Sequence, residues 1–219
     1  MAGLFETIRI REGRIPFLAE HLARLGAGLW RFGIEGAPPG LEQRLRQFEA
    51  EGEVVVRVTV DETGEVITQR PVPVADPMRV VTSTVPHDAY PAKSTVRAQF
   101  ERARDEAEGR GAEEGLLLTA GGHLAEGTIT SLFFWSDELL CTPDLGLGIL
   151  PGIGRARVMT LARRAGIPVA EGRFAPAALL PGAPFLVNAV RGIVETLSLD
   201  DVEVRRDPRT VALRAEFWG

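Results

Sequence analysis

The sequence predicts an α/β protein of the α+β type, in which helices and strands build two domains, residues 1–86 and 87–219. Short runs rich in β-branched residues alternate with helical patterns along the chain. A proline-rich stretch at residues 71–77 and a loop at residues 87–92 indicate the passage between the domains. With 219 residues, 45% hydrophobic and 25% charged, the chain has the composition of a globular protein with a substantial core.

The N-terminal domain is predicted to combine a small sheet with two helices. Pro16 opens a helix that carries leucines at helical spacing, with His21 on or beside the apolar stripe as a core residue. A shorter, charged helix is expected over residues 41–49. Alternation or β-branched content predicts the strands, which are residues 4–10, 53–60, 66–70 and 79–84.

The C-terminal domain is expected to begin with Lys93 at the entrance of a helix that runs to about Glu108 and buries Val96, Phe100 and Ala103. Further helices are predicted over residues 155–165, with Gly166 as the C-cap, and over residues 176–180. Short apolar runs predict the strands, which are residues 115–119, 129–135, 139–142, 167–171, 185–188 and 192–197.

Composition argues against several classes of function. The net charge is −5 and no dense block of Lys and Arg is present, so we expect no nucleic-acid partner. The single cysteine, Cys141, excludes an internal disulfide and a cysteine-rich metal site, and its apolar neighbours predict a buried side chain. We predict no metal site. Without a long apolar stretch or a signal-peptide pattern, the protein is expected in the cytoplasm, away from membranes.

Lys93 is the only lysine among 25 Lys and Arg residues. Arginine replaces a solvated lysine at little cost, but it cannot supply an amine that loses its proton. A lysine kept at one position therefore suggests Schiff-base chemistry with a carbonyl compound, which requires such an amine. The other interpretation is an exposed lysine left by chance.

Three further features complement this amine. Glu126 supplies a carboxylate at the mouth of a predicted strand, although it could also be a surface residue. Residues 152–154, Gly-Ile-Gly before a helix, offer free backbone N–H groups to an anion. Arg57 interrupts a β-branched run, where its charge requires either a protein carboxylate or a bound anion. Together these features point to a phosphorylated aromatic aldehyde.

The segments around these residues resemble the class IV aminotransferase family, the fold type IV pyridoxal-phosphate enzymes. The resemblance implies an N-terminal α/β sandwich, a C-terminal domain with a barrel-like β core and helices, pyridoxal 5'-phosphate between the domains, and a homodimer. The most specific match is Thr-Pro at residues 142–143 together with residues 148–155. The other matching segments are residues 4–9, 21–25, 53–60, Lys93, 115–118 and 124–133.

The resemblance also implies residue roles. Lys93 would form the Schiff base with the cofactor and, once freed, remove the substrate α-proton. Glu126 would pair with the pyridine nitrogen and keep it protonated, which makes the ring an electron sink. Arg57 and the amides of Ile153 and Gly154 would hold the phosphate.

The sequence departs from the family's usual pattern at several positions. The chain starts three residues before Leu4, where many members carry an additional segment, so part of the substrate-side wall is expected to be missing or to come from a partner subunit. Ser131 stands in place of the usual asparagine, and Gly154 replaces a frequent threonine. Ala189 occupies a position where several aminotransferases place a second phosphate hydroxyl. Phosphate binding is therefore expected to rely on backbone amides and Arg57.

Two features favour one reaction among the family's activities. Arg97, predicted one turn beyond Lys93 on the same helix face, matches an arginine of lyase-type members near the ring hydroxyl; the alternative is a solvated helix charge. Residues 188–193 resemble the Asn-Ser/Ala-Leu-Arg-Gly stretch of the same members. The sequence thus favours 4-amino-4-deoxychorismate lyase, which releases pyruvate and leaves 4-aminobenzoate for folate synthesis. The alternatives are an aminotransferase for branched-chain or D-amino acids and a cofactor-binding protein without catalysis.

Overall fold

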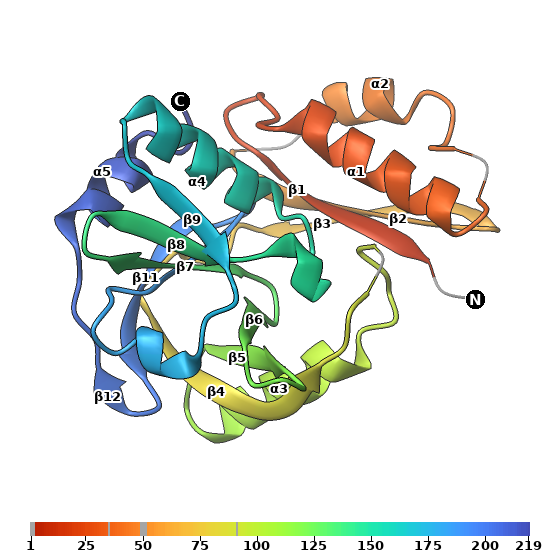
Figure 1. Ribbon diagram of the computed structural model, residues 1–219. Coiled ribbons are helices and arrows are strands. Elements are labelled where there is room, and N and C mark those ends of the chain that lie inside the picture. Colours follow the sequence, from red (N-terminus) through yellow and green to blue (C-terminus); the bar gives the residue numbers. More distant parts are fainter. Residues whose placement is uncertain (1–2, 35, 49–51, 91) are drawn as a thin grey trace. The chain divides into compact units, whose positions relative to one another are not determined.

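The computed structural model describes residues 3–34, 36–48, 52–90 and 92–219, and the chain forms two compact units (Figure 1). Unit 1 comprises Met1–Val74 and Pro91–Val96, and unit 2 comprises Ala75–Tyr90 and Arg97–Gly219. The chain therefore passes between the units three times, and a short segment around Lys93 belongs to unit 1. The sequence predicted two domains that meet at a single boundary, between residues 86 and 87, and this division stays a prediction.

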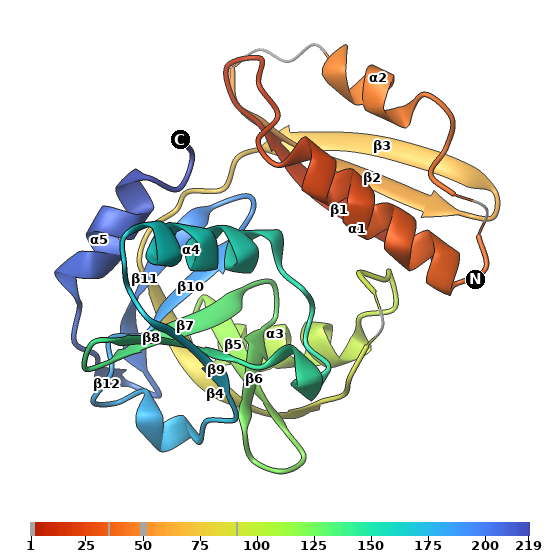
Figure 2. The ribbon, with the colours of Figure 1, turned by 45° about the horizontal axis from the view of Figure 1, so that its top comes forward.

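Unit 1 is a three-stranded antiparallel sheet that two helices cover on one face (Figures 1 and 2). Even-numbered residues of β1, such as Leu4 and Ile8, pack with the helices in one core. Because successive strand residues face opposite sides, Phe5 and Arg57 lie on the sheet face away from the helices. The elements are β1 (Leu4–Ile10), α1 (Leu18–Arg31), α2 (Leu41–Arg46), β2 (Val54–Asp61) and β3 (Gly64–Pro71).

The predicted elements of unit 1 are confirmed with small shifts of their ends. The long helix begins at Leu18 rather than Pro16, because Phe17 has a left-handed backbone with φ of 61°. The short helix ends at Arg46, and its predicted end at residue 49 lies outside the described residues.

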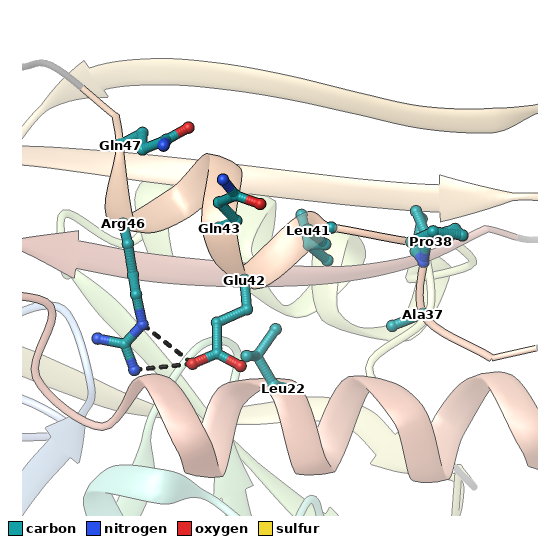
Figure 3. Close-up of a pocket in the computed structure, with 10 residues that line it drawn as sticks. Leu22, Ala37, Pro38, Leu41, Glu42, Gln43, Arg46 and Gln47 are labelled. Atoms are coloured by element: carbon teal, nitrogen blue, oxygen red, sulfur yellow. Dashed lines mark hydrogen bonds and ion pairs between the residues drawn. The ribbon is translucent and has the colours of Figure 1, made fainter.

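A shallow groove lies on the helix side of unit 1, between Leu22 of α1 and the segment that leads into α2 (Figure 3). An ion pair between Arg46 and Glu42, at 2.8 Å, forms part of its lining. The groove is separated from Arg57 and Phe5 by the thickness of the sheet, so it is not part of the candidate site described below.

Unit 2 is built on a nine-stranded mixed sheet that curls into a barrel-like core (Figure 1). The strand order is β6-β5-β4-β11-β10-β7-β8-β9, with β12 paired to β11, and β6 also contacts β7 and β8. Apolar side chains from most strands, among them Leu124, Phe134 and Leu186, fill the interior. The strands are β4 (Met78–His87), β5 (Glu114–Thr119), β6 (Leu124–Gly127), β7 (Ser131–Ser136), β8 (Leu139–Pro143), β9 (Val169–Gly172), β10 (Phe185–Asn188), β11 (Gly192–Leu199) and β12 (Val202–Glu203).

Three helices pack on this sheet, namely α3 (Ala98–Gly109), α4 (Ile153–Arg164) and α5 (Pro208–Ala215). Helix α3 contacts β4 and β5, α4 contacts β7, β9 and β10, and α5 contacts β11. Gly115 allows α3 to approach, because a Cβ there would lie 2.7 Å from the Ala103 carbonyl oxygen. The sequence reasoning missed α5, β6 and β12. It predicted a buried Cys141 correctly, and burial raises the pKa of that thiol.

The prediction that Lys93 stands at a helix entrance is wrong, since α3 begins five residues later at Ala98. The Lys93 carbonyl instead accepts the Phe5 N–H at 2.9 Å, and Ser94 forms an antiparallel bridge with Leu4. The segment thus pairs with the edge strand β1 through backbone hydrogen bonds. Such pairing depends on tertiary structure, so the local sequence does not reveal it. Val96, predicted to be buried, is 69% exposed.

Candidate active site

In unit 1, Lys93 and Arg57 meet at the ring of Phe5. The Lys93 Nζ lies 4.7 Å from the Phe5 ring centroid, and the Arg57 Cζ lies 3.7 Å from it. Cations within about 6 Å of an aromatic centroid are attracted by the ring. The sheet register explains the meeting, because Phe5 is opposite Thr59 on β2, two residues and one pleat from Arg57. Two cations that the sequence separates by 36 positions therefore share one ring.

The Arg57 guanidinium also contacts a hydroxyl, since its Nε donates to the Thr59 Oγ1 at 3.4 Å. Both contacts direct the guanidinium along the sheet face away from the helices. They are compatible with a further anionic partner, which a guanidinium binds through several N–H donors.

Glu6 belongs to the helix side of unit 1, where it forms a buried polar cluster. Its carboxylate contacts the His21 Nδ1 at 2.7 Å and accepts two hydrogen bonds from Arg24, each 2.7 Å long. Burial alone would raise the pKa of Glu6, but the bonds from Arg24 and His21 outweigh it and lower the pKa to about 2. His21 is a buried core residue, as predicted, but only its Nδ1 is bonded, since its Nε2 has no hydrogen-bond partner among the described residues. The matched N-terminal segments thus meet in a structural cluster.

In unit 2, Glu126 is a buried residue inside the strand β6, which contradicts the surface alternative. Its Oε1 lies 3.0 Å from the His87 Nε2 and accepts the Leu150 N–H at 3.1 Å. The Tyr90 hydroxyl lies 3.4 Å from the other oxygen, Oε2. A buried carboxylate with these donors stays compatible with a negative charge.

His87 and Tyr90, which precede Lys93, form an aromatic cluster with Phe100 next to Glu126. The rings of Tyr90 and Phe100 pack edge-on with centroids 5.0 Å apart, and His87 lies 6.1 Å from Tyr90 and 6.3 Å from Phe100. Sequence reasoning assigned residues 87–92 to a loop and missed both His87 and Tyr90. A usable signal was present, since Tyr90 is the only tyrosine and lies three positions before the only lysine.

The N-terminus of helix α4 was predicted to bind an anion. The helix begins at Ile153, with Gly152 as the N-cap and no side-chain cap hydrogen bond, so Ile153 and Gly154 carry first-turn amides. A Cβ on Gly154 would lie 2.9 Å from the Asn188 carbonyl carbon, and one on Gly152 would lie 2.6 Å from the Ser131 Oγ. The close approach explains why Gly154 is not a larger residue, and it leaves backbone groups to meet an anion.

The turn after β10 borders this helix end. The Asn188 Oδ1 accepts the N–H groups of Val190 at 2.9 Å and Arg191 at 2.7 Å, which fixes the turn. Ala189 is buried within it, 9% exposed. Asn188, at the start of this turn, therefore packs against Gly154 in the first turn of α4.

Arg97 is the N-cap residue of α3 and is not on a helix face shared with Lys93. Its Nη2 donates to the Thr128 carbonyl at 2.6 Å, and its Cζ lies 4.8 Å from the Phe100 centroid. Burial lowers the pKa of Arg97, while Tyr90 and Glu126 oppose this shift. The alternative of a solvated helix charge is therefore wrong.

Glu114 is a second buried carboxylate that sequence reasoning missed. It accepts the Thr128 N–H at 2.8 Å and the Thr130 hydroxyl at 2.9 Å, and it also contacts the Thr128 hydroxyl. These bonds fix the turn after β6 and with it the Thr128 carbonyl that receives Arg97. Glu114 thus shapes the site without the signal of a motif, because its partners lie 14 to 16 positions away.

Described separately, the two units offer groups that fit pyridoxal 5'-phosphate. Unit 1 provides an amine and a guanidinium. Unit 2 provides a buried carboxylate and a helix N-terminus without a side-chain cap, where the glycines at 152 and 154 leave no room for a Cβ. The amine can react with the aldehyde of the cofactor, and the carboxylate can pair with its ring nitrogen. The guanidinium and the amides can bind its phosphate. Among the described residues, no group of three or more His, Cys, Asp or Glu side chains is placed to hold a metal ion, and no helix has the length and apolar character to cross a membrane.

Comparison with known proteins gives relatives of two activities. The chain is 32% identical over 118 residues to a branched-chain-amino-acid aminotransferase of Escherichia coli K12, which is 52% of this chain and 38% of that protein. It is 32% identical over 90 residues to an aminodeoxychorismate lyase of Bacillus subtilis 168, which is 41% of this chain and 31% of that protein. These matches thus span about a third of the length of each relative.

Solved structures match nearly the whole chain. One described as a candidate 4-amino-4-deoxychorismate lyase has a TM-score of 0.83 at 29% identity, covering 99% of this chain and 90% of that one. A Brucella abortus aminotransferase bound to pyridoxal phosphate shares the fold, with a TM-score of 0.87 at 21% identity over 99% of this chain and 89% of that one. The fold predicted from the resemblance is therefore confirmed.

The family model for amino-transferase class IV matches residues 3–199, which include Lys93, Arg57, Glu126 and the α4 N-terminus. This range covers both units and all the groups described above. The chain therefore belongs to the class IV aminotransferase family of pyridoxal-phosphate-dependent enzymes.

Proposed function

We propose that this protein is a 4-amino-4-deoxychorismate lyase that uses pyridoxal 5'-phosphate. Lys93 would bind the cofactor covalently, Glu126 would face its ring nitrogen, and Arg97 would lie near its ring hydroxyl. Arg57, with the amides of Ile153 and Gly154, would hold the phosphate. When bound, the cofactor supplies an electron sink for negative charge that develops on the substrate.

Small residues complete the proposed phosphate site. Ala189 and Gly154 offer no hydroxyl, so the site depends on backbone N–H groups and on one guanidinium. A helix N-terminus favours an anion through its free amides and its dipole. Arg57 would add the full positive charge that the amides lack.

Lys93 would perform the proton transfers. Its free amine accepts the proton from the substrate carbon that carries the amino group. The enolpyruvyl group then leaves and gains a proton to become pyruvate, while the ring becomes aromatic as 4-aminobenzoate. The atoms of the substrate equal those of the two products, so the reaction consumes neither water nor a second substrate.

The placement of Arg97 is the observation that carries the choice of the lyase. Its guanidinium is partly buried, donates to Thr128 and stacks on Phe100. A charge kept inside unit 2 is costly unless it serves a partner, and lyase-type members carry an arginine at this position. The similarity to the candidate lyase structure, at 29% identity over 99% of the chain, gives further support.

An aminotransferase for branched-chain or D-amino acids is the second candidate. The observation in its favour is the longer match to the E. coli branched-chain enzyme, 118 residues against 90 for the B. subtilis lyase. Such an enzyme would use the same lysine, carboxylate and phosphate site. The two reactions differ in the fate of the substrate: the lyase expels the enolpyruvyl group and keeps the nitrogen in its product, whereas an aminotransferase keeps the carbon skeleton and leaves the nitrogen on the cofactor.

For the assembly and location, we infer a homodimer in the cytoplasm that serves folate synthesis. Sedimentation of the purified protein with and without cofactor tests the dimer.

The decisive assay offers 4-amino-4-deoxychorismate to the cofactor-loaded protein and quantifies both products. The proposal predicts pyruvate and 4-aminobenzoate in equal amounts. Absence of both products, together with transfer of an amino group from a branched-chain amino acid to a keto acid, would replace the lyase with the aminotransferase.

A further inference from the structure

His87 is the last residue of β4, and its side chain is buried beside Tyr90 and Phe100. The Nε2 lies 3.0 Å from the Glu126 Oε1, with both side chains removed from solvent. No motif predicts this residue. Its single polar contact to a candidate cofactor residue calls for an explanation, because a buried polar side chain is costly unless its groups are used.

Only one of the two ring nitrogens of His87, Nε2, has a hydrogen-bond partner among the described residues. Within the described part of the chain, the buried Nδ1 has no hydrogen-bond partner. A hydrogen on Nδ1 would be buried without an acceptor, whereas a hydrogen on Nε2 is received by Glu126. The hydrogen-bond network therefore assigns the hydrogen to Nε2, and the ring donates one hydrogen bond to the carboxylate.

The backbone around His87 is fixed by three kinds of contact. In the parallel pairing of β4 with β5, His87 is in register with Thr119. The Gln99 side chain holds the next residue from both sides, accepting the Asp88 N–H at 2.6 Å and donating to the Asp88 carbonyl at 2.8 Å. The Tyr90 N–H donates to the Gly148 carbonyl at 3.3 Å. These three contacts together fix the backbone that carries the imidazole, and with it the position of the Nε2 donor.

We propose that His87 is a positioning residue that orients the Glu126 carboxylate toward the ring nitrogen of the cofactor. The proposal rests on the role of Glu126 given above. His87 and the Leu150 amide both donate to Oε1, which fixes the rotation of the carboxylate and directs Oε2 toward the ring. Because the imidazole donates without a second hydrogen, it orients the carboxylate without neutralising it, and the anion can favour the protonated ring nitrogen.

The test compares two amide variants that differ only in reach. His87→Gln places an N–H near the position of Nε2, whereas His87→Asn is shorter and does not reach Glu126. His87→Phe keeps the ring in the aromatic cluster without a donor. His123→Asn is the matched control, since it changes a histidine in the turn between β5 and β6. Unfolding temperatures verify that each variant folds.

Two measurements use the holoenzyme without turnover. The first is the ¹⁵N signal of the ring nitrogen, recorded with ring-labelled cofactor, which reports whether this nitrogen is protonated. The second is the cofactor Kd. We expect His87→Asn and His87→Phe to shift the signal toward the unprotonated form and to raise the Kd about tenfold, the scale of one hydrogen bond to a charged group. The Gln and His123 variants should resemble the parent protein.

The outcomes separate this inference from the proposed function. If His87→Asn leaves the signal and the Kd unchanged, or if Gln does no better than Asn, the positioning role is wrong. Glu126→Gln is measured alongside. An unchanged signal in that variant would reject Glu126 as the ring partner and this inference with it, whereas a shift seen only in Glu126→Gln would reject His87 alone. If the Phe variant does not fold, the Asn and Gln pair still decides.

Discussion

Glu6 in unit 1 and Glu126 in unit 2 are both buried carboxylates in contact with a histidine, at 2.7 and 3.0 Å. They differ in their other donors. Glu6 accepts two hydrogen bonds from the Arg24 guanidinium, whereas Glu126 accepts one from the Leu150 amide and lies near the Tyr90 hydroxyl. A guanidinium that binds through two N–H groups compensates a carboxylate within the protein. The dipolar donors to Glu126 orient its carboxylate, whose charge also acts on the Arg97 guanidinium and opposes the lowering of the Arg97 pKa by burial.

A buried Glu–His pair is therefore not by itself a sign of function. The pair in unit 1 joins β1 to α1 and stabilises that unit. The pair in unit 2 is bonded to the chain just before helix α4, because Glu126 accepts the N–H of Leu150, which lies two residues before the N-cap Gly152. We therefore expect changes at Glu6 to affect stability and changes at Glu126 to affect the cofactor.

The largest effect is expected for Lys93→Ala, because the sequence holds no second lysine. The variant should bind no cofactor covalently. Borohydride reduction followed by mass spectrometry of the peptides measures this directly. Lys93→Arg is the control, since it keeps the positive charge over Phe5 without a reactive amine, and it should fail equally. A reduced, cofactor-labelled peptide from the Ala variant would reject the assignment.

Exchanging the two carboxylates for amides tests the comparison itself. Glu126→Gln should lower turnover by about a hundredfold or more, the scale of a lost catalytic electrostatic group, with little change in unfolding temperature. Glu6→Gln should leave turnover per folded molecule unchanged and cost about 3 kcal/mol of stability, because Arg24 stays buried without its anion. Steady-state kinetics and denaturant unfolding of both variants separate the roles. The comparison fails if the two variants lose the same property.

Arg57→Ala should weaken cofactor binding by about ten- to a hundredfold, since a hydrogen bond to a charged group contributes roughly 1.5–3 kcal/mol. The reaction catalysed should stay the same. Arg70→Ala is the control, because Arg70 is an exposed arginine of the neighbouring strand β3. Fluorescence titration with the cofactor gives both dissociation constants. Equal constants for the two variants would show that Arg57 holds no phosphate.

The smallest effect concerns acid stability. The pKa of Glu6 is lowered from 4.5 to about 2 in the folded protein. A depressed pKa stabilises the fold fully above the unfolded value and loses this contribution as the pH falls toward the folded value. Between pH 7 and pH 3 the loss from this group is about 2 kcal/mol. Denaturant unfolding at the two pH values, with Glu6→Gln as reference, measures it; a parent protein with the same pH dependence as the variant would contradict the shifted pKa.

Much of the fold was predictable because most strands are short apolar or β-branched runs and most helices have apolar periodicity. The Lys93 segment was not, because the open edge of β1 is created by tertiary structure and overrides the local helical pattern. For the same reason, Arg97 was predicted one helical turn beyond Lys93, whereas it is the N-cap residue of α3. His87, Tyr90 and Glu114 were missed, since their partners are 14 to 39 positions away. Sequence motifs identified the residues that are proposed to contact the cofactor. The residues that hold these in place became visible only in the structure.

The measurement that tests the central claim most directly follows the cofactor during turnover of one substrate. Limiting enzyme is mixed with excess 4-amino-4-deoxychorismate in the absence of any keto acid. Because the lyase returns the amine nitrogen with its product, the account predicts many turnovers per enzyme molecule, with the cofactor still in its aldehyde form. A single turnover that leaves the cofactor as its amine, and resumes only after a keto acid is added, would contradict the lyase and establish an aminotransferase.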